Sequence, residues 1–201
     1  MDHLEIEVKF HVREPEALRS AIAALGCRSL GRAFERNYCY DDHRHSLRAR
    51  KALLRLRKDS GARLTFKSVP PTADAGYKVL REMEVGLDDF DTMAGILEAI
   101  GFRRTRVYEK WRETFSCDHA QLCLDTLPMG TFLEIEGPRS AIDTLARRLH
   151  LPWEQRILAN YLEMFDHLRR TLGLPFSDLT FDNFKGLRVD PDWPRVFAAG
   201  P

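Results

Sequence analysis

Thirteen charged side chains lie on segments of the sequence that alternate between apolar and polar residues. In the first segment, residues 4–10, apolar residues occupy every second position, and Glu5, Glu7 and Lys9 lie between them. Because successive side chains of a β-strand point to opposite faces, we expect these charges on one face of a strand. Six of the thirteen side chains are cations: Lys9, Arg55, Arg57, Lys67, Lys110 and Arg112. Seven are carboxylates: Glu5, Glu7, Glu82, Glu84, Asp125, Glu134 and Glu136.

These residue types predict a site for a polyanion and a divalent cation. Guanidinium groups match phosphate oxygens in a bidentate way and Lys provides a point charge, so the six cations are candidate phosphate-binding and catalytic residues. Carboxylates repel phosphate, but they can bind Mg²⁺ or Mn²⁺ ions that bridge to phosphate oxygens. Cations and metals together are what phosphoryl transfer requires, since that chemistry depends mostly on positioning and charge stabilisation.

The segments that carry these residues form an internal repeat. Glu-Ile-Glu-Val at residues 5–8 returns as Glu-Met-Glu-Val at residues 82–85, and an amphipathic helix pattern follows each, ending at Gly26 and at Gly101. Each half therefore reads as a β-α-β-β-β unit, and a repeat of this length constrains the fold strongly. The remaining strands are expected at residues 34–40, 53–58, 63–67, 105–115, 122–125 and 132–136.

Two such units supply the eight strands that can close a small barrel. We predict an α+β fold: an eight-stranded antiparallel closed β-barrel with helices packed outside and the charged strand faces turned inward. Burying so many charges is costly unless they pair or bind a ligand. A lumen of salt bridges without any ligand is the alternative interpretation.

The order of the charged motifs resembles the CYTH family, the triphosphate tunnel metalloenzymes. Glu5-Ile6-Glu7-Val8-Lys9 matches the family signature E-x-E-x-K. This pattern is weak on its own, but it becomes specific together with the other charged motifs in their order. The accompanying motifs are Arg55-Leu56-Arg57, Lys67, Glu82-Met83-Glu84, Lys110-Trp111-Arg112, Asp125 and Glu134-Ile135-Glu136. The resemblance implies phosphate binding by the six cations. It also implies a metal role for Glu5, Glu7, Asp125, Glu134 and Glu136, with Glu82 and Glu84 in support.

The resemblance covers roughly residues 1–170, so we predict a tunnel domain at 1–172 and an extension at 173–201. Further helices are expected at residues 140–149 and 161–172. Asn160-Tyr161 resembles the Ser-Tyr pair often found where the last helix of the family begins, with Asn in place of Ser. Spaced aromatic residues favour packing of the extension on the barrel, with partner docking as the alternative.

Composition excludes several classes of partner. The chain has 201 residues, of which 44% are hydrophobic, and a net charge of +1, which gives no reason to expect nucleic acid or membrane binding. No apolar run approaches the roughly 18 residues of a membrane span, and we see no secretory signal. Four cysteines without C-x-x-C spacing indicate reduced, mostly buried thiols in a cytoplasmic protein. Dimers are the commonest assemblies, so a homodimer is the default expectation.

Two reactions fit the predicted site. Water could attack a terminal phosphorus of inorganic, thiamine or nucleoside triphosphate, or the ribose 3′-hydroxyl of ATP could attack the α-phosphorus and release pyrophosphate, as in class IV adenylyl cyclases. We favour hydrolysis of a small triphosphate. A non-catalytic polyphosphate-binding module is a third interpretation, but it would not need seven carboxylates.

Overall fold

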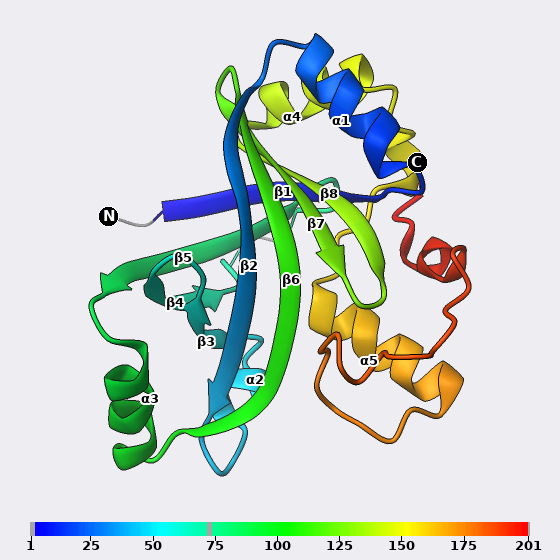
Figure 1. Ribbon diagram of the computed structural model, residues 1–201. Helices are drawn as coiled ribbons and strands as arrows, with labels where there is room; N and C mark the ends of the chain where they lie inside the picture. The colour runs from blue at the N-terminus through cyan, green and yellow to red at the C-terminus, as the bar shows by residue number, and fades with distance from the viewer. Residues whose placement is uncertain (1–2, 72–73, 201) are drawn as a thin grey trace.

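The computed structural model describes residues 3–71 and 74–200. Over this part of the chain, eight antiparallel strands close into a barrel in the order β1-β5-β4-β3-β2-β6-β7-β8, which confirms the predicted architecture (Figure 1). The strands are β1 (His3–His11), β2 (Arg28–Asp41), β3 (Leu53–Lys58), β4 (Ala62–Ser68), β5 (Lys78–Leu87), β6 (Arg103–Cys117), β7 (Ala120–Leu127) and β8 (Gly130–Glu136).

The two long strands β2 and β6 extend beyond the predicted ranges. They pair from Arg28↔Ser116 to Asp41↔Arg103, so they form one long side of the barrel. The start of β2 lacks alternation and contains Gly31, whose φ of 107° accompanies a register shift next to Ser29. Glycine tolerates this left-handed backbone, and such an irregularity bends a strand without ending it.

Helices cover the outer apolar faces of the strands and leave the charged faces inside. α1 (Pro15–Ala24) and α4 (Arg139–Arg148) bury Ile22 and Ile142 against Val8 and Leu122. α3 (Phe90–Ala99), the counterpart of α1 in the second repeat, packs on the other side of the barrel against Leu56. A short α2 (Ser46–Ala49) follows β2. Because successive side chains of a strand point to opposite faces, burial of the apolar face under the helices directs Glu7 and Lys9 into the lumen.

The C-terminal part of the chain packs against the barrel wall beside β6. α5 (Tyr161–Leu172) is followed by residues 174–200, which run back past it (Figure 1). Leu179 donates its N–H to the carbonyl of Val107 and accepts from the N–H of Glu109, both at 2.9 Å. Since β7 pairs with β6 only from Trp111 to Cys117, these bonds satisfy backbone groups that β7 does not reach.

The prediction that all four cysteines are reduced is wrong for one pair. Cys27 and Cys117 form a disulfide across 90 residues of sequence. The β2–β6 pairing explains it, because Arg28 lies opposite Ser116 and the next residue pair outward is Cys27 and Cys117. Cys39 and Cys123 are free and buried. Within residues 3–71 and 74–200, no helix has the length and apolar character needed to cross a membrane.

Candidate active site

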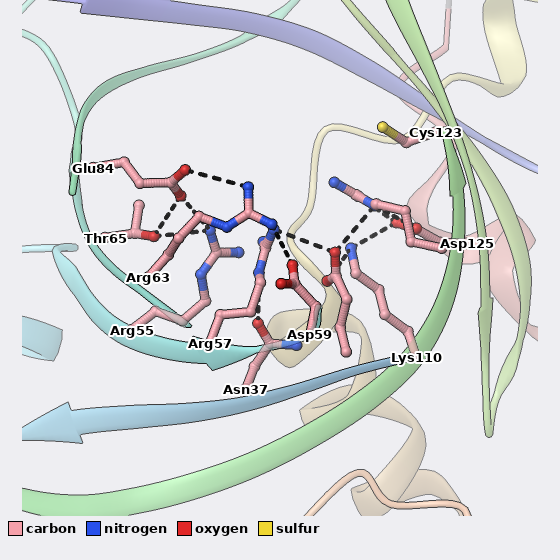
Figure 2. A network of polar contacts seen from close by, with 12 residues as sticks. Asn37, Arg55, Arg57, Asp59, Arg63, Thr65, Glu84, Lys110, Cys123 and Asp125 are labelled. Carbon is pink, nitrogen blue, oxygen red and sulfur yellow. Dashed lines mark hydrogen bonds and ion pairs between the residues drawn. The ribbon is translucent and has the colours of Figure 1, made fainter. Parts of the chain in front are cut away.

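Twelve of the thirteen predicted site residues take part in ion pairs inside the barrel, and Glu136 takes part in none of those that the described residues form. Lys9 of β1 lies 2.9 Å from Glu134 of β8 and 3.8 Å from Glu7. Lys110 and Arg112 of β6 contact Asp125 of β7. The remaining links join Arg112 to Glu134, Lys67 to Glu5 and Glu82, and Arg55 to Glu84. Figure 2 shows Arg55, Arg57, Lys110 and Asp125 pointing into the same space from β3, β6 and β7.

Asp125 is a fully saturated buried anion. Its side chain is 0% exposed and accepts hydrogen bonds from Lys110 Nζ at 2.8 Å and Arg112 Nε at 2.7 Å. Tyr161, the first residue of α5, donates its hydroxyl to the same carboxylate at 2.9 Å. Burial and the nearby Asp125 hold the pKa of Tyr161 well above its usual value. Asp125 therefore fixes Lys110 and Arg112 in orientation and connects α5 to the lumen.

Arg55 and Arg57 of β3 are held by neutral groups as well as by carboxylates. Arg55 donates to the hydroxyls of Tyr108 at 3.2 Å and Thr65 at 3.1 Å. Arg57 donates through Nε to Asn37 Oδ1 at 3.1 Å. Neutral partners fix a guanidinium without cancelling its charge. The carboxylates nearest to these two side chains are Glu84, 3.7 Å from Arg55, and Glu35, 3.2 Å from Arg57.

Several of these partners were not predicted as site residues. Glu35 and Asn37 lie on the inner face of β2, where Glu35 is 3% and Asn37 0% exposed. Lys78 of β5 lies 2.6 Å from Glu7. Arg36 lies between Glu35 and Asn37 on the outer face, so it interrupts the alternation of apolar and polar residues that marked the other strands.

Four of the seven predicted carboxylates gather at one end of the network. We call Glu5, Glu7, Glu82 and Glu136 the acidic cluster. Lys67 contacts Glu5 and lies 2.7 Å from Glu82, while Glu7 pairs with Lys78. None of the ion pairs among the described residues involves Glu136. Burial, followed by the charges of Glu5 and Glu7, raises the pKa of Glu136 to about 7.

The acidic cluster has the donor chemistry of a site for Mg²⁺ or Mn²⁺. Both ions prefer carboxylate oxygens, and a divalent cation would relieve the repulsion from Glu5 and Glu7 that, after burial, raises the pKa of Glu136. Within the described ranges, no three or more His, Cys, Asp or Glu side chains are already grouped to enclose a metal ion. Lys67 and Lys78 lie among these carboxylates, so they and a metal would compete for the same oxygens.

The other three predicted carboxylates lie among cations. Asp125 binds Lys110 and Arg112, and Glu134 lies between Lys9 and Arg112. Although burial opposes it, the charges of Lys9 and Arg112 hold the pKa of Glu134 well below its usual value. Glu84 accepts from Thr65 at 2.8 Å and lies 3.7 Å from Arg55.

The lumen is therefore electrically polarised. In the acidic cluster two lysines, Lys67 and Lys78, face four carboxylates. Elsewhere in the network cations outnumber carboxylates by six to five. The six are Lys9, Arg55, Arg57, Arg63, Lys110 and Arg112, and the five are Glu35, Asp59, Glu84, Asp125 and Glu134. An anion is favoured at one end of the lumen and a cation at the other.

The closed antiparallel barrel and its charged lumen together form a tunnel lined by ion pairs. The chain belongs to the CYTH domain family, whose model matches residues 3–154. A curated relative named "Putative adenylate cyclase" from Methanocaldococcus jannaschii is 23% identical over 173 residues, which cover 80% of this chain and 98% of the relative.

Solved structures share the fold. One, named a putative adenylate cyclase from Vibrio parahaemolyticus, has a TM-score of 0.73 at 21% identity and covers 83% of this chain and 99% of its own. Another, from Hippeastrum, is named a "putative adenylyl cyclase", HpAC1, with a dominant triphosphatase activity. It has a TM-score of 0.60 at 19% identity and covers 81% of this chain and 95% of its own. At these identities the likeness concerns the fold.

Proposed function

We propose that this chain is a divalent-metal-dependent enzyme that hydrolyses a triphosphate inside its tunnel. The observation that carries the proposal is the polarised lumen. A metal-bound triphosphate pairs a polyanion with a cation, and the lumen presents cations around Asp125 and carboxylates around Glu136. Membership in the CYTH family supports a substrate of this class.

The cations have defined roles in this proposal. Arg55, Arg57, Lys110 and Arg112 bind phosphate oxygens, and Lys9 contributes from the side of β1. Their partners Asn37, Tyr108, Thr65 and Asp125 keep them oriented before substrate arrives. Preorganised charges of this kind stabilise the negative charge of a phosphoryl-transfer transition state without paying for reorganisation during the reaction.

The carboxylates divide into two roles. Glu5, Glu7, Glu82 and Glu136 would hold Mg²⁺ or Mn²⁺, which supplies charge neutralisation and activation of water when bound. Asp125 and Glu134, which the sequence also suggested as metal ligands, act instead by orienting Lys9, Lys110 and Arg112. Glu84 supports Arg55 in the same way.

Cyclisation of ATP to cyclic AMP and pyrophosphate is the alternative reaction. The name of the curated relative supports it, whereas the name of the Hippeastrum protein shows that a cyclase name and a dominant triphosphatase activity can go together. Both reactions need the same phosphate-binding cations, Lys9, Arg55, Arg57, Lys110 and Arg112, which we call the cation clamp. A non-catalytic polyphosphate-binding module is a weaker alternative, because it would not need the acidic cluster.

The products formed from ATP distinguish these functions. Purified protein is incubated with ATP and Mg²⁺ or Mn²⁺, and the nucleotides are separated by anion-exchange chromatography. Hydrolysis gives ADP or AMP with orthophosphate or pyrophosphate and no cyclic AMP. Cyclic AMP as the main product would replace hydrolase with cyclase. Parallel reactions with thiamine triphosphate and inorganic triphosphate identify the preferred substrate, and an absence of turnover with all three would contradict both reactions.

A further inference from the structure

Glu35 lies among the cations of the clamp and has no role in the proposed reaction as described above. Its backbone pairs with that of Lys110 across β2 and β6. Its carboxylate lies 3.2 Å from Arg57, 3.6 Å from Lys110 and 3.9 Å from Arg112. With a side chain only 4% exposed, Glu35 is a buried anion facing three of the cations proposed to bind phosphate.

The contacts of Glu35 are looser than those of Asp125. Lys110 and Arg112 donate to Asp125 at 2.8 and 2.7 Å, which are normal lengths for charged hydrogen bonds. The same two cations stay 3.6 and 3.9 Å from Glu35, beyond hydrogen-bonding distance. Glu35 Oε2 is buried without any hydrogen-bond partner among the described residues. Asp125 thus sets the orientation of Lys110 and Arg112, and Glu35 balances their charge from a distance.

An unsatisfied buried carboxylate oxygen is unfavourable, so its position needs an explanation. Burial alone would raise the pKa of Glu35, but Lys110, Arg112, Arg57 and Arg55 together lower it to about 2. Glu35 is therefore an anion at neutral pH. An anion that faces three cations, and lies beyond hydrogen-bonding distance of two of them, resembles a phosphate oxygen in its charge and in the kind of groups around it.

We propose that Glu35 is a positioning residue that stands in for a substrate phosphate. In the free protein its carboxylate keeps Arg57, Lys110 and Arg112 converged, and a bound triphosphate takes over these three contacts. This inference rests on the proposed function and adds a consequence to it. Because Glu35 competes with the substrate for the same cations, its charge limits the affinity for polyanions and favours release of the product.

Binding of inorganic triphosphate tests the inference directly. Isothermal titration calorimetry is done in EDTA with the wild type and with Glu35→Gln, Glu35→Asp and Glu109→Gln. Glu35→Gln keeps the size of the side chain and removes its charge, whereas Glu35→Asp keeps the charge. Glu109→Gln is the matched control, since Glu109 is 5% exposed and pairs with Arg36 outside the lumen.

We expect Glu35→Gln to bind inorganic triphosphate at least about fivefold more tightly than the wild type, because a repulsive charge has left a site of low dielectric. Glu35→Asp and Glu109→Gln should not bind it more tightly. In steady-state assays with metal, Glu35→Gln should lower KM without raising kcat, since tighter binding of the ground state does not lower the barrier. If Glu35→Gln does not fold, Glu35→Met carries the same expectation.

Unchanged or weaker binding by a folded Glu35→Gln variant would overturn the inference and assign Glu35 a structural role alone. Equal tightening in Glu109→Gln would overturn it too, because the effect would then come from net charge and not from position. If the wild type hydrolyses triphosphate and Glu35→Gln shows the same affinity and kinetics, only the role of Glu35 is refuted. A wild-type protein that neither binds nor hydrolyses triphosphate would refute the proposed function as well.

Discussion

Replacing Asp125 by Asn removes the charge that organises the clamp while keeping the shape of the side chain. Asp125 is completely buried and accepts from Lys110, Arg112 and Tyr161. Breaking a buried ion pair by removing one partner costs about 3–5 kcal/mol, because the remaining charge stays buried without compensation. Arg112 still contacts Glu134, and Lys110 lies 3.6 Å from Glu35, so we expect a loss near the lower limit, about 3 kcal/mol.

Thermal unfolding measures this loss. For a chain of this size, 1 kcal/mol shifts Tm by about 2–4 °C, so Asp125→Asn should unfold about 6–12 °C below the wild type. Inorganic triphosphate should raise the Tm of the variant more than that of the wild type, because the polyanion compensates the charge that Asp125 no longer balances. Differential scanning calorimetry in EDTA, with and without inorganic triphosphate, gives both quantities.

Glu113→Gln serves as the control for this experiment. Glu113 accepts from Arg19 on the outer face of β6, away from the lumen. Its loss should lower Tm without increasing the stabilisation by triphosphate. The reasoning about Asp125 is refuted if Asp125→Asn unfolds at the wild-type temperature, or if triphosphate stabilises the two proteins equally.

Three further changes have defined outcomes. Arg57→Ala should raise KM for triphosphate and lower kcat, and unchanged kinetics would mean that this face of β3 is not part of the clamp. The pKa of Glu136, raised from 4.5 to about 7, means that the folded protein retains a proton that the unfolded chain releases, so stability should fall as pH rises from about 4.5 through 7. Glu136→Gln should flatten that decline in Tm, and an equally steep decline would place its cause elsewhere. Reducing the Cys27–Cys117 disulfide, which closes a loop of 90 residues, should cost about 2–4 kcal/mol in denaturant unfolding, and Cys27→Ser should be insensitive to reductant.

The alternation of apolar and charged residues was sufficient to predict the barrel and most of its lumen. It identified the strand that carries Glu5, Glu7 and Lys9, and its recurrence at Glu82 and Glu84 indicated the duplicated unit. It failed along β2, where Arg36 lies on the outer face between the inward-facing Glu35 and Asn37. Arg36 interrupts an outer face that otherwise carries the aromatic residues Phe34 and Tyr38, so the contrast between the two faces is lost around Glu35 and Asn37.

Partners in three dimensions could not be predicted from the same pattern. Seven carboxylates on inner faces looked equivalent in sequence, but strand register places Arg112 opposite Asp125 and Glu7 opposite Glu136. The first pairing neutralises a carboxylate and the second brings two together, so the residues acquire different chemistry. The Cys27–Cys117 disulfide depends in the same way on the register of β2 and β6.

Release of orthophosphate from inorganic triphosphate, measured with and without divalent metal, tests the central claim most directly. The polarised lumen predicts turnover that saturates with both triphosphate and Mg²⁺ or Mn²⁺ and that stops when EDTA removes the metal. Tight binding of triphosphate without turnover at any metal concentration would contradict the account, because the acidic cluster would then have no part in the chemistry.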